Sequence, residues 1–72
     1  MFDFIYIDGC HEPDHVMYES ALCFDILKKG GFMLFDDYGW GNCRHGIESF
    51  LLSYNNKYRL LFKDWQVLVE KL

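Results

Sequence analysis

The chain has 72 residues and a formal net charge of −4, with seven Phe, five Tyr, two Trp and one Pro. A chain this short forms at most one small domain, and its aromatic content is typical of a buried core rather than of a disordered segment. Its Lys and Arg residues are scattered, and no apolar run approaches the roughly 20 residues of a membrane span. Composition therefore argues against a nucleic-acid footprint and a transmembrane helix.

The first predicted strand covers residues 2–8, FDFIYID, an almost continuous apolar run that ends in an acid. Such a run is typical of a strand that is buried on both faces, as in a parallel sheet. Gly9 then allows the chain to turn.

A helix is predicted over residues 14–29. Pro13 fits its first turn, where a missing N–H costs nothing, and Gly30 is suited to stop it in a left-handed cap. Lys28 and Lys29 would lie at its negative end, as the helix dipole favours. One face of this helix carries Val16, Ser20, Cys23, Phe24 and Leu27.

Residues 31–36, GFMLFD, form a second short apolar run that ends in an acid, which predicts a βαβ unit with two parallel strands. A second helix is expected over residues 44–54. The last stretch, residues 58–72, contains two β-rich runs separated by Lys63 and Asp64, which predicts a hairpin with an antiparallel final strand. The predicted order is β-α-β-α-β-β, an α/β fold with a mixed sheet.

Acids end both strands of the predicted βαβ unit. Asp8 and Asp36 stand 28 residues apart, and Asp37 follows directly. Neighbouring parallel strands lie about 4.8 Å apart, and the carboxyl edge of such a sheet is where α/β proteins bind ligands. Clustered carboxylates repel one another unless a cation or a retained proton is present, and Mg²⁺ suits an all-oxygen site.

These motifs resemble a known family. DFIYIDGCH, followed by a helix and LKKGGFMLFDDY, is similar to the second half of class I S-adenosylmethionine-dependent methyltransferases. The nearest branch has a fourth strand ending in Y-I-D-G-x-H and a fifth reading G-G-x-x-x-x-D-D-Y. The resemblance implies a Rossmann-like sheet in which this chain supplies strands 4-5-7-6, with strand 7 antiparallel.

The resemblance also implies the site residues. The metal ligands of metal-dependent relatives correspond to Asp8, Asp36 and Asp37, and a bound Mg²⁺ would lower the pKa of a hydroxyl on the methyl acceptor. His11 matches the family's His and would act as general base, so the expected catalytic residues are His11 and Asp8. The expected partner is a small-molecule methyl acceptor.

The family's donor-binding elements are missing from the sequence. A glycine-rich turn after strand 1 and a ribose-binding acid after strand 2 are both absent, and Gly39, Gly41 and Gly46 do not have G-x-G-x-x-G spacing. Residues 1–72 are therefore expected to be a single partial domain that binds S-adenosylmethionine poorly alone. Its expected protein partner is a second copy or a missing N-terminal half.

Two zinc sites are the metal-binding alternatives to this interpretation. His11, Glu12 and His15 have H-E-x-x-H spacing, but Pro13 interrupts the helix that a metalloprotease needs. A mixed site of Cys10, His11, Cys43 and His45 lacks recognisable spacing.

The rival to the enzyme is a non-catalytic remnant that keeps the fold and pairs through an apolar strand edge at residues 2–7. The cysteines Cys10, Cys23 and Cys43 lack C-x-x-C spacing, and they are expected to be reduced thiols of a cytoplasmic protein.

Overall fold

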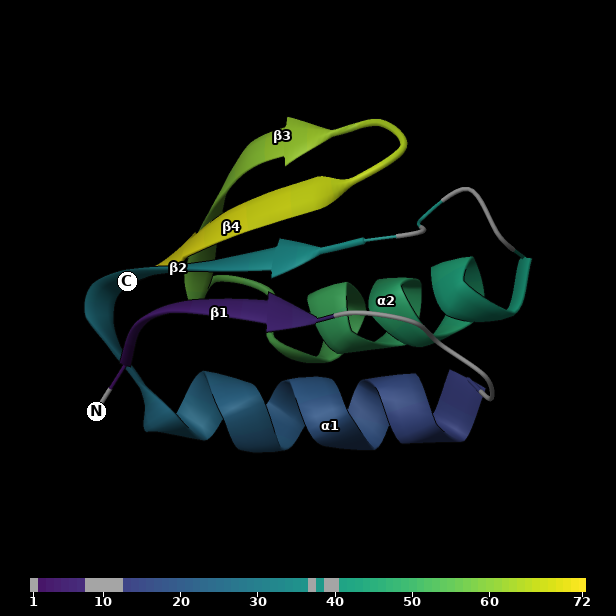
Figure 1. Ribbon diagram of the computed structural model, residues 1–72, viewed down its shortest axis with the longest axis horizontal. Coiled ribbons are helices and arrows are strands. Elements are labelled where there is room, and N and C mark those ends of the chain that lie inside the picture. Colours follow the sequence, from purple (N-terminus) through teal and green to yellow (C-terminus); the bar gives the residue numbers. More distant parts are fainter. Residues whose placement is uncertain (1, 8–12, 37, 39–40) are drawn as a thin grey trace.

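The computed structural model describes residues 2–7, 13–36, 38 and 41–72. The order of its elements is the predicted β-α-β-α-β-β (Figure 1). Their bounds are β1 (Phe2–Ile7), α1 (Pro13–Ile26), β2 (Leu27–Phe35), α2 (Gly41–Ser53), β3 (Tyr58–Lys63) and β4 (Val67–Lys71).

The strands form one four-stranded sheet in the order β1-β2-β4-β3. β1 runs parallel to β2, with Ile5 opposite Met33 and Ile7 opposite Phe35. β4 runs antiparallel to both β2 and β3. The order and directions predicted for strands 4-5-7-6 are therefore confirmed.

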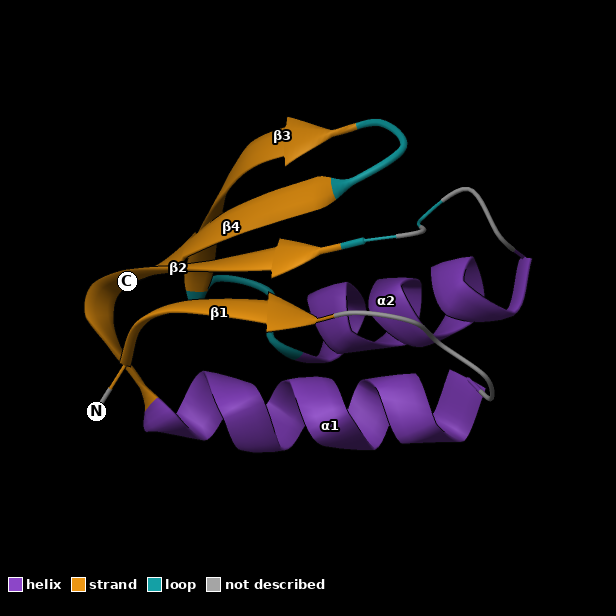
Figure 2. Ribbon diagram, in the orientation of Figure 1, coloured by secondary structure: helices purple, strands orange, loops and turns teal. Residues whose placement is uncertain are grey.

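Both helices lie on the same side of this sheet (Figure 2). Along each strand, alternate side chains point toward the helices and away from them. The side chains that point toward the helices form the buried core, together with the inner faces of α1 and α2: Ile7, Val16, Phe24, Leu27, Met33, Phe35, Ile47, Phe50, Leu51, Val67 and Val69.

The prediction that the first strand is buried on both faces is wrong. Phe4 is 52% exposed and Tyr6 is 47% exposed, whereas Ile7 is buried. The reason is that neither described helix covers the second face of the sheet (Figure 2).

The first helix starts at Pro13 as expected, but it ends at Ile26 rather than at residue 29. Lys28 and Lys29 lie in β2, so they do not stabilise the last helical turn. Gly30 does adopt a left-handed backbone, with φ of 83°, but within β2. The pairing of β1 with β2 shifts register there, between Phe2 and Phe4, so Gly30 serves a strand irregularity rather than a helix cap.

The second helix and the hairpin lie close to their predicted positions. α2 covers residues 41–53 rather than 44–54, and residues 64–66 join β3 to β4. Phe50 of α2 packs against Phe24 of α1 and Phe35 of β2, with both ring centroids 5.4 Å away. These contacts fix α2 beneath the sheet. Neither described helix is long and apolar enough to cross a membrane.

Candidate functional site at the carboxyl ends of β1 and β2

The carboxyl ends of the two parallel strands are joined directly. The backbone N–H of Asp36 donates a hydrogen bond to the carbonyl oxygen of Ile7, at 3.0 Å. Ile7 is the last residue of β1, and Asp36 is the first residue after β2. The expectation that these strands are neighbours, with Asp36 at their shared edge, is therefore confirmed.

The carboxylate of Asp36 is held by two neutral donors. The Tyr6 hydroxyl donates to Oδ2 at 2.5 Å, and Nε2 of Gln66 donates to Oδ1 at 3.1 Å. Tyr6 comes from β1 and Gln66 directly precedes β4, so residues distant in sequence converge on one carboxylate. The two hydrogen bonds therefore fix the orientation of the Asp36 carboxylate.

The other predicted site residues, Asp8, His11 and Asp37, lie outside the described residues. Their roles stay predictions. Within residues 2–7, 13–36, 38 and 41–72, no three His, Cys, Asp or Glu side chains gather as a metal site would require.

A second carboxylate lies near the same end of the molecule. Glu48 of α2 accepts a hydrogen bond from the Tyr38 hydroxyl and forms an ion pair with Nζ of Lys63, at 2.9 Å. The hydrogen bond from Tyr38 and the charge of Lys63 hold the pKa of Glu48 below its usual value. Burial, followed by the hydrogen bond to Glu48, raises the pKa of Tyr38. The Tyr38 ring also lies 5.0 Å from the Arg44 guanidinium.

Tyr38 is buried against the core. Its hydroxyl donates a hydrogen bond to Glu48, so the Tyr38 side chain packs at the end of the sheet.

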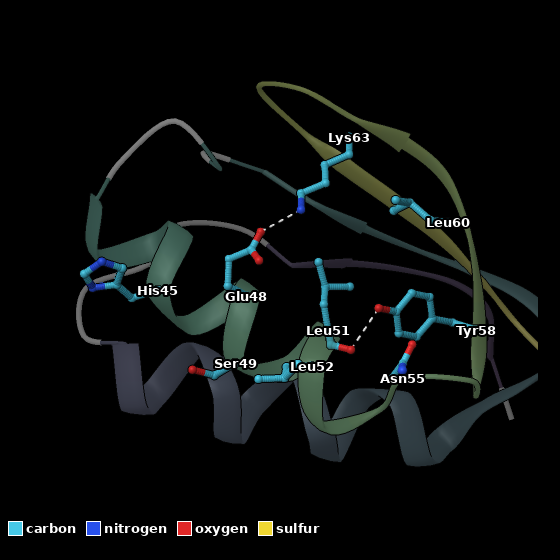
Figure 3. A pocket seen from close by; sticks show the side chains of 9 residues that line it. All are labelled: His45, Glu48, Ser49, Leu51, Leu52, Asn55, Tyr58, Leu60 and Lys63. Atoms are coloured by element: carbon cyan, nitrogen blue, oxygen red, sulfur yellow. Dashed lines mark hydrogen bonds and ion pairs between the residues drawn. The ribbon is translucent and has the colours of Figure 1, made fainter.

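A concave region of about 560 Å³ lies between α2 and β3. Figure 3 shows the Lys63–Glu48 ion pair at one end and the Tyr58 hydroxyl at the other, where it donates to the carbonyl of Leu51 at 2.8 Å. The side chains of Glu48, Lys63 and Tyr58 are thus paired within the chain. Its lining residues are His45, Glu48, Ser49, Leu51, Leu52, Asn55, Tyr58, Leu60 and Lys63.

The cysteines differ from the expectation of reduced thiols. Cys23 is a free thiol, and burial raises its pKa. Cys43 is disulfide-bonded, so the expectation is wrong for this residue. A sulfur in a disulfide is not a thiolate ligand, which removes Cys43 from the mixed zinc site considered above.

Sequence patterns did not identify Tyr6 or Gln66 as site residues. Tyr6 carries a weak signal, because alternation along a strand that ends at Ile7 places it on the face opposite to Ile7. Gln66 carries none, since its contact with Asp36 depends on how β4 pairs with β2.

A protein-family model described as a methyltransferase domain matches residues 1–38. The match covers more than half of the chain and includes β1, α1, β2 and Asp36. A search of curated proteins and a search of solved structures each give no match. The matched segment contains both motifs that resemble class I methyltransferases, and the sheet has the strand order that this fold requires. The chain therefore belongs to the methyltransferase domain family.

Proposed function

We propose that the chain supplies the acceptor side of a methyltransferase site, in which a methyl group passes from S-adenosylmethionine to an oxygen of a small molecule. The observation that carries the proposal is the position of Asp36. It lies at the carboxyl edge of two parallel strands, within the segment that matches the family. This edge is where open α/β sheets bind their ligands.

A divalent cation would suit a cluster of carboxylates at this edge, of which the structure describes Asp36. Hydrogen bonds from Tyr6 and Gln66 orient the carboxylate, which is what outer partners do for metal-binding carboxylates. Asp8, Asp36 and Asp37 would hold Mg²⁺ there. When bound, the cation would favour deprotonation of the acceptor's hydroxyl group. His11 would accept that proton on its imidazole.

The donor side of the site would come from elsewhere. Gly30 and Gly31 lie within β2 and Gly46 lies within α2, so these described glycines do not form a cofactor-binding turn. No residue of the 72 is assigned to S-adenosylmethionine. The chain would work as part of a longer polypeptide and would be inactive alone.

The experiment that tests this function uses the full reading frame in which the chain is encoded. The expressed protein is incubated with methyl-tritiated S-adenosylmethionine and a panel of hydroxylated small molecules. Asp36→Ala is expected to lower the transfer rate by about 100-fold. This is the smaller of the rate losses that are typical when a group that assists proton transfer or stabilises charge is removed. Asp25→Ala is the matched control, because Asp25 lies near the C-terminal end of α1, away from the carboxyl ends of β1 and β2. Equal rates for the two variants would overturn the assignment of Asp36.

The rival function is a non-catalytic interaction module, and the exposed apolar side chains of β1 favour it. The DNA upstream of Met1 discriminates between the two. An in-frame glycine-rich turn there supports the enzyme, and a stop codon with native expression supports the module.

A further inference from the structure

The turn that joins β3 to β4, residues 64–66, lies beside the carboxyl end of β2. Val67, the first residue of β4, pairs with Phe35, and Nε2 of Gln66 donates to Oδ1 of Asp36 at 3.1 Å. The turn also closes on itself, because the backbone N–H of Asp64 donates to the carbonyl oxygen of Gln66 at 2.9 Å. The position of the Gln66 amide group therefore depends on where the whole turn lies.

Tyr38 holds this turn through the backbone. Its N–H donates a hydrogen bond to the carbonyl oxygen of Trp65, at 3.0 Å. Tyr38 also follows Asp36 by two residues in the sequence. Hydrogen bonds and short stretches of chain therefore connect four residues into a closed ring: Asp36, Gln66, Trp65 and Tyr38. In such a ring, a shift of one member is passed to the next.

The side chain of Tyr38 is itself anchored to α2. It is 9% exposed, and its hydroxyl donates a hydrogen bond to Glu48. Glu48 also forms an ion pair with Nζ of Lys63 at 2.9 Å, at one end of the groove in Figure 3. Lys63 is the last residue of β3 and directly precedes the turn. One carboxylate on α2 therefore holds both Tyr38 and the end of β3 from which the turn starts.

We propose that Tyr38 is a positioning residue for Asp36 and that it acts through Trp65 and Gln66, an inference that rests on the proposed role of Asp36 in the chemistry. The Tyr38 ring packs in the core and its hydroxyl is bonded to Glu48, so its part is to hold the turn. The turn then presents the Gln66 amide to the Asp36 carboxylate. Removal of the outer partner of a metal-binding carboxylate typically lowers metal affinity or activity by about 10- to 100-fold.

Tyr58 offers a matched control for Tyr38. Its hydroxyl donates to the carbonyl oxygen of Leu51 in α2, at 2.8 Å, at the other end of the same groove (Figure 3). Tyr58 begins β3, whereas the turn follows the last residue of that strand. Tyr38→Phe and Tyr58→Phe each remove one hydroxyl hydrogen bond to α2 and keep the aromatic ring. A merely structural role predicts similar effects of the two substitutions, and a positioning role predicts an effect on Asp36 from Tyr38→Phe alone.

The first measurement needs no metal. The protein of the full reading frame is labelled with ¹³C and ¹⁵N, and nuclear magnetic resonance follows the carboxyl carbon of Asp36 and the side-chain amide of Gln66. Both signals are expected to shift in Tyr38→Phe and to stay in place in Tyr58→Phe. Urea denaturation checks that the two variants are folded and compares their losses of stability.

Calorimetric titration with Mn²⁺ gives the second measurement, on the same protein. Gln66→Ala is expected to weaken Mn²⁺ binding by about 10-fold, and Tyr38→Phe by a smaller factor. Because Tyr38 acts through Gln66, the double variant should bind Mn²⁺ as weakly as Gln66→Ala alone, rather than showing the two losses added.

Additive losses of Mn²⁺ affinity would overturn the inference. Unchanged signals of Asp36 and Gln66 in Tyr38→Phe would also overturn it, and so would equal shifts in Tyr58→Phe. If the unsubstituted protein binds no Mn²⁺, the cation of the proposed function fails, and the signals of Asp36 and Gln66 still decide whether Tyr38 positions the carboxylate.

Discussion

The two faces of the sheet differ in what covers them. On one face, Phe35, Val69 and their neighbours are buried beneath α1 and α2. On the other, Phe4 and Phe32 are partly exposed, and no described helix lies over them. Yet both faces are apolar. The difference indicates that the covered face stabilises this chain and that the open face is available to a ligand or another polypeptide.

Each face also has a carboxylate near the same end of the sheet. Glu48 is held against Lys63 and Tyr38, so its negative charge is compensated within the fold. Asp36 is held by the neutral donors Tyr6 and Gln66. Glu48 is accordingly interpreted as a structural acid, and Asp36, at the carboxyl edge of β1 and β2, as the acid proposed to take part in the chemistry.

Removal of an aromatic ring should have the largest effect on the free energy of unfolding. The size of that effect should depend on whether the ring lies on the covered or the open face of the sheet. Phe50 is fully buried between α1 and the sheet, so Phe50→Ala is expected to lower the free energy of unfolding by about 3–5 kcal/mol. Phe32 is 38% exposed, so Phe32→Ala should cost clearly less. Urea denaturation of both variants measures the two changes. Equal losses would mean that the open face stabilises the chain as much as the covered face does.

Acid pH should weaken the cluster around Glu48. Its folded pKa lies below the ordinary 4.5, so its stabilising contribution is complete above that pH and is lost as pH falls through the folded value. Glu48→Gln should cost about 1 kcal/mol or less at neutral pH, since the pair is partly exposed and screened by solvent.

The measurement is urea denaturation of Glu48→Gln and the unsubstituted chain at neutral pH and below pH 4.5. The difference between them should shrink in acid. Asp25→Asn, at an exposed position of α1, serves as the control. If the difference in free energy of unfolding between the two proteins is constant with pH, the charge of Glu48 does not stabilise the fold.

The smallest effect is expected for the exposed ion pair of Arg59 and Glu70, on strands β3 and β4. Exposed pairs contribute about 0.2–1 kcal/mol, so Arg59→Ala should change the thermal midpoint only slightly, and less so at high salt. A large loss of stability would show that ion pairs stabilise the β3 edge, whereas the comparison of the two faces attributes stability to apolar burial.

The order of elements and the strand directions could be predicted because each depends on a local pattern. A βαβ unit is indicated by three features that follow one another along the chain at typical spacings. They are the apolar run before Asp8, the helical face that includes Phe24, and the acid at Asp36. The end of α1 was placed too late because a positive φ suits both a helix cap and a strand irregularity, and Gly30 has the second role. Pattern alone does not distinguish them.

The partners of Asp36 could not be predicted for a different reason. Tyr6 and Gln66 reach it across strand pairs that are set by register, and register is a property of the whole sheet rather than of neighbouring residues. The exposure of Phe4 was also missed, since an apolar run indicates that a strand can be buried but does not show which of its faces a helix covers.

The most direct test of the central claim, that the Asp36 edge is the reactive edge, is titration of the ¹⁵N-labelled chain with Mn²⁺ followed by nuclear magnetic resonance. The account predicts that paramagnetic broadening begins at the amides of Tyr6, Asp36 and Gln66, and that Asp36→Ala abolishes it while Asp25→Ala does not. Broadening that is unchanged in Asp36→Ala, or that begins at another part of the chain, would contradict the account.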